Sequence, residues 1–165
     1  MSSNDHPGPP PAAQVTVRAA GDGDAGEILT LQRAAYLVEA QAYGDPFIPP
    51  LVETLAEVRE QIRTVTVLVA TTGHRLVAAV RLEVSGSTGR IGRLAVVPDL
   101  QGQGLGARML LAAEQAAPAE VTRFELFTGA ASTRNLALYT HRGYVEFDRQ
   151  RLNESVELVH LRRPR

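Results

Sequence analysis

The apolar positions of this chain follow the two-residue period of strands in several short segments. Residues 15–18 alternate between apolar and polar side chains, and residues 64–70 are rich in β-branched residues. Residues 76–84 and 90–97 are also strand-like, and short glycine-containing segments connect these three later runs. Such connections are typical of hairpins, so the pattern predicts an antiparallel meander over residues 64–97.

The period changes to three or four residues in three longer segments. Apolar side chains between residues 24 and 42 fall on one helical face, and Asp24 with Glu27 has the spacing of a capping box. A glycine and three prolines follow this segment and end the predicted helix. Similar patterns predict helices over residues 51–62 and 105–117.

The last third of the chain returns to short elements. We expect a strand at residues 121–128, a short helix at 132–141, and strands at 144–147 and 155–161 joined by a turn around Asn153. The predicted order is β-α-α-β-β-β-α-β-α-β-β. It contains one strand-helix-strand unit, which implies one parallel crossover. The expected fold class is α+β, with a mixed, mostly antiparallel sheet and flanking helices.

Length and composition favour one soluble domain. The 165 residues suffice for one domain with its own core, which we place at residues 14–165. Residues 1–13 contain four prolines and small polar residues, so we expect a disordered N-terminal tail. No apolar run could span a bilayer and no signal peptide is recognisable, which predicts a cytoplasmic protein without a membrane partner.

Charge and residue usage exclude several classes of function. The net charge of −1 and the pI of about 6.4 argue against a nucleic-acid partner. The chain has no cysteine, which rules out thiol catalysis and cysteine-ligated zinc. The four histidines are scattered without ligand spacing, so no metal site is expected.

One glycine-rich stretch joins a predicted strand to a predicted helix. Residues 96–106 read Val-Val-Pro-Asp-Leu-Gln-Gly-Gln-Gly-Leu-Gly. Glycines allow positive φ angles and a close approach of a ligand to the main chain. The unpaired N–H groups at the start of the following helix favour anions. The stretch therefore predicts a site for a pyrophosphate.

Two other glycine motifs, the dinucleotide-binding motif and the P-loop, are alternative interpretations of this stretch. Gly102, Gly104 and Ala107 also satisfy the dinucleotide-binding pattern G-x-G-x-x-G/A, but that motif normally lies in a first βαβ unit and directly after its strand. Here residues 98–101 intervene, and the chain that follows is too short for a doubly wound sheet. The Gly-Lys-Ser/Thr sequence of a P-loop is absent.

The hexapeptide at residues 101–106 resembles the Q/R-x-x-G-x-G/A motif of the GNAT superfamily of N-acetyltransferases. Residues 93–98 resemble the fourth strand of that family. Residues 135–139 together with 143–145 resemble its second signature region, and the predicted element order agrees as well. The resemblance covers residues 15–161. It implies the acyl-CoA N-acyltransferase fold and the transfer of an acetyl group from acetyl-CoA, as co-substrate, to an amine.

The resemblance also implies which residues bind the cofactor. In the family, the fourth strand carries a bulge and separates from the fifth, and its freed backbone groups bind the pantetheine arm. By position these are Leu94, Ala95 and Val96. Backbone groups of the glycine loop hold the pyrophosphate, and the expected residues there are Gln101, Gly102, Gln103, Gly104, Leu105 and Gly106. Asn135 matches a residue that contacts the cofactor arm, although it could instead pair with Ser132 at a helix start.

Tyr139 matches the family position whose phenol faces the cofactor sulfur, which implies a general acid. The alternative is that its ring packs beside Leu136. A base that accepts the amine proton is harder to assign, because no carboxylate occupies the usual position on the fourth strand. Glu83 and Glu53 are the candidates, each of which could equally be a surface group.

The sequence says less about the residues that bind the amine acceptor. Residues 36–47, with Tyr36, Tyr43, Asp45 and Phe47, lie in the helix-loop-helix stretch that closes over the acceptor in the family. A small amine or a protein amine fits equally well. The sequence leaves the oligomeric state open between a monomer and a homodimer, although members of this family often pair through edge strands. The alternative to an enzyme is a catalytically silent module of the same fold that binds or senses acyl-CoA.

Overall fold

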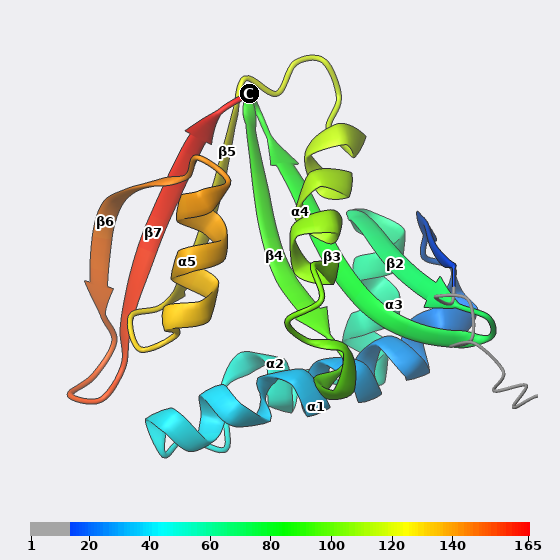
Figure 1. Cartoon of the computed structure of the whole chain (residues 1–165), viewed down its shortest axis with the longest axis horizontal. Coiled ribbons are helices and arrows are strands. Elements are labelled where there is room, and N and C mark those ends of the chain that lie inside the picture. Colours follow the sequence, from blue (N-terminus) through cyan, green and yellow to red (C-terminus); the bar gives the residue numbers. More distant parts are fainter. Residues whose placement is uncertain (1–13) are drawn as a thin grey trace, which may run out of the picture.

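The computed structural model describes residues 14–165, so the predicted disordered tail of residues 1–13 lies outside the described residues. The described chain forms a seven-stranded sheet in the order β1-β2-β3-β4-β5-β7-β6 (Figure 1). The strands are β1 Val15–Ala19, β2 Thr66–Thr72, β3 Arg75–Ser85, β4 Thr88–Val96, β5 Arg123–Gly129, β6 Val145–Arg151 and β7 Glu157–Pro164. Only the β4–β5 pair is parallel among these strands, which confirms the predicted mixed sheet and its single crossover.

Five α-helices accompany the sheet. They are α1 Ala25–Tyr43, α2 Pro49–Val52, α3 Leu55–Thr64, α4 Leu105–Ala116 and α5 Thr133–His141. Short 3-10 helices precede α1 at Asp22–Asp24 and follow β4 at Pro98–Leu100. None of the helices in residues 14–165 is both long and apolar enough to cross a membrane.

The sheet divides into two halves that meet at one end only. The parallel ladder between β4 and β5 joins Thr88–Arg90 to Arg123–Glu125 and then stops. Figure 1 shows the result as a V, with β4 and β5 together near the C-terminus and apart at the opposite end. Helices α1 and α2 run across the open end, α4 lies over the half that contains β3 and β4, and α5 lies over β5 and β7 (Figure 1).

A bulge in β4 lies where the two strands separate. Ala95 pairs with Ala79, but Gly92 already pairs with Arg81, so two residues of β4 face one residue of β3. Bulges bend and twist a strand locally, which accounts for the departure of β4 from β5. Arg93 lies in the bulge with φ of 49°, the one positive φ of a non-glycine residue in the described chain.

The core forms where helices cover the first half of the sheet. Helix α4 packs on β2, β3 and β4, helix α1 on β3 and β4, and helix α3 on β2. Val69 and Val77 of the central strands, Met109 and Leu110 of α4, and Phe124 of β5 are completely buried. The predicted apolar runs therefore supply this core, and burial of each such side chain contributes roughly 1.5–3 kcal/mol.

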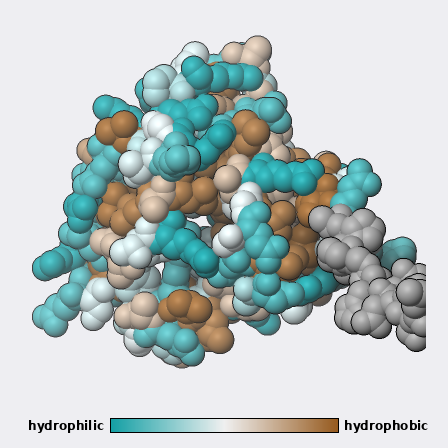
Figure 2. Space-filling model, in the orientation of Figure 1, coloured by the Kyte–Doolittle hydropathy of each residue, from teal (hydrophilic) through white to brown (hydrophobic). Residues whose placement is uncertain are grey.

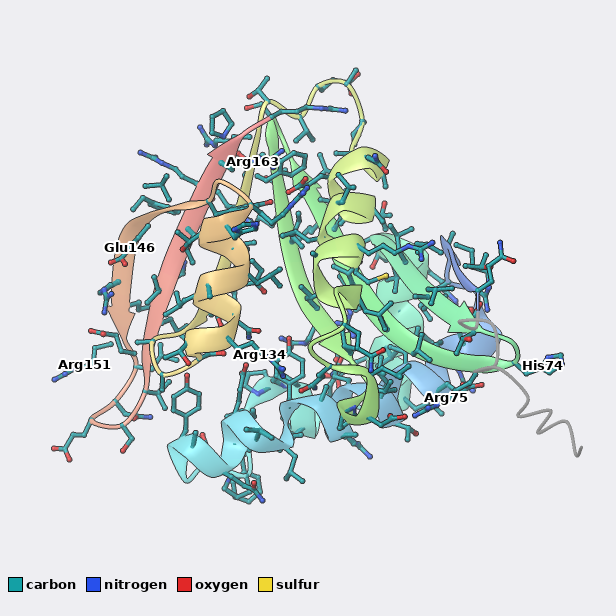
Figure 3. The ribbon with its side chains drawn as sticks, viewed as in Figure 1. His74, Arg75, Arg134, Glu146, Arg151 and Arg163 are labelled. Carbon is teal, nitrogen blue, oxygen red and sulfur yellow. The ribbon has the colours of Figure 1, made fainter. Side chains whose placement is uncertain are left out.

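A buried polar cluster links α4 to the second half. The Tyr144 hydroxyl donates to Glu114 at 2.9 Å, and Arg142 and Arg163 each lie 3.4 Å from the same carboxylate. Glu114 is 5% exposed. Figure 3 shows Arg163 near the closed end of the V. This cluster fixes the two halves together at the end where their strands already pair.

Two local predictions were wrong. The single helix expected over residues 51–62 is divided into α2 and α3, because Thr54 begins a new helix: its hydroxyl accepts from the Glu57 N–H at 3.3 Å, and Glu57 accepts from the Thr54 N–H at 2.7 Å. The capping box expected for Asp24 and Glu27 does not form. Asp24 instead accepts from Arg18 and from the Gly21 N–H.

The remaining elements agree with the sequence patterns, apart from small shifts of their ends. The turn expected around Asn153 is present, with its side-chain oxygen accepting from the N–H groups of Ser155 and Val156 at 2.9 Å. Strand β6 is longer than expected, since it continues to Arg151 with every side chain exposed. An amphipathic pattern could not reveal a strand that buries neither face.

Candidate active site

The glycine loop brings backbone N–H groups to the open end of the V. Residues 101–104 connect the 3-10 helix after β4 to the first turn of α4. Gly102 and Gly104 have φ angles of 77° and 84°, and Gly104 is the N-cap of α4. These conformations favour glycine, which explains why the loop carries it at alternate positions. The unpaired N–H groups at the start of α4 make the loop suitable for an anion.

The edge of β4 beyond the bulge is free of β5. Ala95 remains paired with Ala79 on the other side and is buried, whereas Leu94 and Val96 are partly exposed. The Leu94 carbonyl accepts from the Tyr36 hydroxyl at 3.3 Å, and the Val96 carbonyl accepts from Gln101 Nε2 at 3.0 Å. Each carbonyl keeps a second lone pair, so this edge can still bind an extended ligand.

A cavity of about 420 Å³ connects this edge to the glycine loop. It is lined by several of the residues expected to bind a cofactor, namely Leu94, Val96, Gln101, Gly102, Gly104, Leu105, Gly106 and Asn135. Two other expected residues, Ala95 and Gln103, are not part of the lining. Figure 2 shows a hollow in the middle of this face, with hydrophobic residues above it and more hydrophilic residues beside and below it. We call this space the loop cavity.

Arg134 adds a positive charge to the loop cavity. It lies at the start of α5, at the open end of the V (Figure 3), and its Nη1 donates to Gln101 Oε1 at 3.1 Å. A side chain added at Gly102 would meet Arg134 Nη2 at 2.9 Å. The guanidinium therefore lies directly over the glycine loop, where it suits a phosphate.

A second cavity of about 750 Å³ adjoins the loop cavity. Its walls come from α1, the segment around α2, strands β3 to β5 and the β6–β7 hairpin, and Tyr139 of α5 contributes to them. We call it the wide cavity. Tyr36, Glu39 and Asn135 are the described residues that line both cavities. These three side chains therefore mark where the two spaces meet.

Glu39 is the carboxylate at this junction. Asn135 Nδ2 donates to Glu39 Oε1 at 3.2 Å and to the Thr128 hydroxyl at 3.3 Å, so Asn135 does not make the alternative pair with Ser132. Burial raises the pKa of Glu39 above its usual range. A carboxylate with a raised pKa is a better proton acceptor, and Glu39 forms no ion pair with the described residues.

Tyr139 belongs to the same polar group. Its ring is buried against Tyr144, with ring centroids 6.1 Å apart, and the residue lines the wide cavity. Burial raises the pKa of Tyr139, and the nearby Tyr36 and Glu39 raise it further. The phenol therefore stays protonated at neutral pH and can donate.

The two glutamates proposed as bases from the sequence differ in the structure. Glu53 accepts two hydrogen bonds from Arg81, at 2.7 and 2.9 Å, and one from Gln32 Nε2 at 2.7 Å. Burial alone would raise the pKa of Glu53, but these partners outweigh it and the pKa is lowered. A carboxylate so strongly held is a poor proton acceptor. Glu83 lines the wide cavity, is exposed, and lies directly opposite Arg90.

Sequence reasoning named Tyr36 and Tyr43 but missed Glu39 and Arg134. A signal for Glu39 exists in the spacing, because residues 36, 39 and 43 are three and four apart and share one face of α1. Arg134 carried no comparable signal, since its position depends on how α5 meets the glycine loop. Within residues 14–165, no group of three or more metal-binding side chains comes together.

Comparisons with known proteins agree with this geometry. No curated protein matches the chain. PaiA N-acetyltransferase from Thermoplasma acidophilum, solved in complex with coenzyme A, is 14% identical over 89% of this chain and 98% of that chain, with a TM-score of 0.73. Ribosomal-protein-S18-alanine N-acetyltransferase from Escherichia coli is 18% identical over 92% and 94%, respectively, also with a TM-score of 0.73.

A third structure, yncA from Salmonella typhimurium with acetyl-CoA, is described as a putative acetyltransferase and is 17% identical over 91% of this chain and 93% of that chain, with a TM-score of 0.70. At these identities the likeness establishes the fold. A family model described as an acetyltransferase (GNAT) domain matches residues 36–163. Since this match spans most of the sequence, the chain belongs to the GNAT family of acetyltransferases.

Proposed function

We propose that this protein is an N-acetyltransferase that moves an acetyl group from acetyl-CoA to an amine by direct attack. The observation that carries the proposal is the meeting of two cavities at Tyr36, Glu39 and Asn135. One cavity ends at an anion-binding loop, and the other is a separate space of suitable size for a small acceptor. The related structures bound to coenzyme A or acetyl-CoA support the choice of donor.

Acetyl-CoA would occupy the loop cavity. The N–H groups of residues 101–106 would hold its pyrophosphate, with Arg134 as an additional cation. The backbone of residues 94–96 would bind the pantetheine arm along the edge of β4, and Asn135 would contact the arm from the opposite side. This arrangement directs the thioester toward the junction of the two cavities.

The reaction requires two proton movements. The neutral amine attacks the thioester carbonyl, and a C–N bond forms while the nitrogen loses a proton to Glu39. The tetrahedral intermediate then breaks its C–S bond, and the CoA thiolate takes a proton from Tyr139. Transfer of the Glu39 proton through water to the phenolate restores both groups. The products are an N-acetyl amine and CoA with its thiol protonated.

Replacing Gly104 with aspartate should abolish the stabilisation of the protein by acetyl-CoA. The new carboxylate would lie at the N-terminus of α4, where it competes with the pyrophosphate. A ligand at 100 times its Kd stabilises the folded state by about 2.7 kcal/mol, which shifts the Tm by several degrees. Thermal unfolding with and without acetyl-CoA measures this shift.

Gly104→Asn is the matched control, because asparagine has nearly the same size, tolerates positive φ and carries no charge. It should keep a large part of the shift. A folded Gly104→Asp variant with the normal shift would show that the pyrophosphate lies elsewhere.

Replacing Tyr139 with phenylalanine should lower kcat by about tenfold or more, since general acids typically contribute 10²–10⁴ and a thiolate is a good leaving group. The Kd for acetyl-CoA should change little. Tyr144→Phe is the comparison: it also removes one buried hydroxyl, but that hydroxyl bonds to Glu114, so the variant should lose stability and keep its turnover. Equal turnover of wild type and Tyr139→Phe, with chemistry rate-limiting, would make water the proton source.

A screen of amines with acetyl-CoA tests the proposal itself. Release of CoA together with an acetylated product, detected by mass, supports the enzyme. Saturable binding of acetyl-CoA without product from any amine would instead favour the silent binding module. Glu39 favours the enzyme, because a binding module needs no proton acceptor at the junction. Whether two copies pair remains a prediction.

A further inference from the structure

The charged groups around the wide cavity are almost all matched by neighbours. Glu53 is held by Arg81, whose two Nη atoms reach its two oxygens. Arg90 lies between Glu83 on β3 and Glu125 on β5 in the sheet register. Opposite charges placed directly across strands stabilise each other, so Arg90 already has acidic neighbours on both sides.

Arg93 has a less complete set of partners than Arg81. The residue lines the wide cavity, and the Nε atom of its guanidinium is buried without a hydrogen-bond partner in residues 14–165. Its one ion pair in that range is to Glu53 at 3.7 Å, and both oxygens of Glu53 are already taken by Arg81. The backbone of Arg93 is held at positive φ by the bulge, a conformation that is unfavourable for a residue other than glycine. The fold therefore keeps in this cavity a guanidinium whose nearest anion is shared with Arg81 and lies beyond hydrogen-bond distance.

A second polar atom in the cavity has no partner. The Tyr43 hydroxyl is buried and makes no hydrogen bond to the described residues, and Tyr43 lines the same space. Buried donors without partners are rare in folded proteins. Two of the three such atoms found in the described chain belong to residues of this cavity. Both are hydrogen-bond donors.

We propose that the acceptor is an amine that also carries a carboxylate, with the carboxylate bound by Arg93. The inference rests on the proposed function, because it assumes that Glu39 receives the amine at the junction. Glu39 forms no ion pair with the described residues, and the one ion pair of Arg93 among them is long, at 3.7 Å. The two side chains then offer charges of opposite sign in one cavity, as a zwitterion requires. A guanidinium is well suited to a carboxylate, since it donates two parallel hydrogen bonds.

The walls of the wide cavity describe the rest of the acceptor. Ile48, Leu126, Phe127, Val156 and Leu158 contribute apolar surface. Such walls favour an aliphatic or aromatic side chain. The substrate class is therefore a small amino acid with an apolar side chain, free at both its amine and its carboxylate.

Matched pairs of acceptors test this inference. L-leucine and L-phenylalanine are compared with L-leucinamide and L-phenylalaninamide, which keep the amine and the side chain and lose only the negative charge. The amine of an amide is less basic, so more of it is neutral at a given pH and chemistry alone favours the amide. We expect the wild-type protein to prefer the free acid nonetheless, by about tenfold or more in kcat/KM, since hydrogen bonds to charged groups are worth about that factor.

Variants of Arg93 connect this preference to one side chain. Arg93→Asn tolerates the positive φ and should remove the preference by raising KM for the acid, with little change for the amide. Arg93→Lys keeps the charge but loses the two parallel hydrogen bonds, and should retain part of the preference. Arg59→Gln removes an exposed arginine of α3 and should behave as wild type. Melting temperatures check that each variant is folded.

A binding measurement tests the inference even if the acetyl transfer is too slow to follow. In the presence of CoA, the wild type should bind N-acetyl-L-phenylalanine more tightly than its amide. The Arg93→Asn variant should bind the acid and the amide with the same weak affinity. Acetylation of amides or other uncharged amines with no preference for the acid would overturn this inference and leave the acetyltransferase intact. Absence of any acetylated amine would overturn both.

Discussion

Replacing Glu53 with glutamine should lower the free energy of unfolding by about 3–5 kcal/mol, the usual cost of removing one partner from a buried ion pair. The side chains of Glu53 and Arg81 are each only 10% exposed, and their closest atoms are 2.7 Å apart. Glutamine leaves the Arg81 charge buried without an anion. Urea unfolding at neutral pH measures the loss, with Glu60→Gln on the exposed face of α3 as the control that should change little.

The same ion pair predicts a pH dependence. The pKa of Glu53 is lower in the folded state than its ordinary value, so its contribution is complete above that ordinary value of 4.5 and is lost as the pH falls through the folded pKa. The Glu53→Gln variant should lack this acid-sensitive part of the stability. A variant as stable as wild type but at least 100-fold slower would restore Glu53 as the catalytic base.

Replacing Glu39 with glutamine should lower kcat by about 10²–10⁴, the usual contribution of a general base. The amide still accepts a hydrogen bond from Asn135 but cannot take a proton. In the wild type, kcat should fall as the pH drops through the pKa of Glu39, which burial keeps above its ordinary value of 4.5. Initial rates from pH 5 to pH 9 would measure both effects, with Glu120→Gln in an exposed loop as the control.

The Glu39→Gln substitution should raise the stability of the protein although it lowers kcat. A carboxyl group whose pKa is raised by folding binds more protons in the folded state, so the folded state loses stability as the pH rises from 4.5 through the folded pKa. Glutamine removes this loss, and Glu39→Gln should be more stable than wild type at neutral pH. A slower but more stable variant would distinguish a catalytic group from a structural one. Normal turnover in the variant would exclude Glu39 as the base.

The order of elements could be predicted from the sequence because apolar residues mark each buried element, as a nearly continuous run in β3 and with a helical period in α4. Residues 76–84 and 105–117 are clear cases, since β3 and α4 supply much of the core. The division of the segment after α1 was missed because the apolar spacing continues through Thr54. One hydroxyl at a helix start is a weaker pattern than four spaced apolar residues, yet it decides where α3 begins.

The candidate site was predictable only where backbone conformation dictates residue type. Gly102 and Gly104 stand out because positive φ favours glycine, whatever the ligand. Glu39 and Arg93 are ordinary charged residues in sequence. What distinguishes them is their surroundings. Glu39 is partly buried and has no cation beside it among the described residues, and the carboxylate nearest to Arg93, that of Glu53, is already bound by Arg81. These properties arise from tertiary contacts between segments far apart in the chain.

The separation of β4 from β5 gives this sheet four edges instead of two. The outer pair is β1 and β6, whereas the inner pair, β4 and β5, lines the V. Exposed strand edges generally invite pairing with another protein chain. Here α1 crosses the open end and α5 lies beside the gap (Figure 1). The inner edges therefore offer their main-chain hydrogen bonds to a narrow, extended ligand that lies within the V.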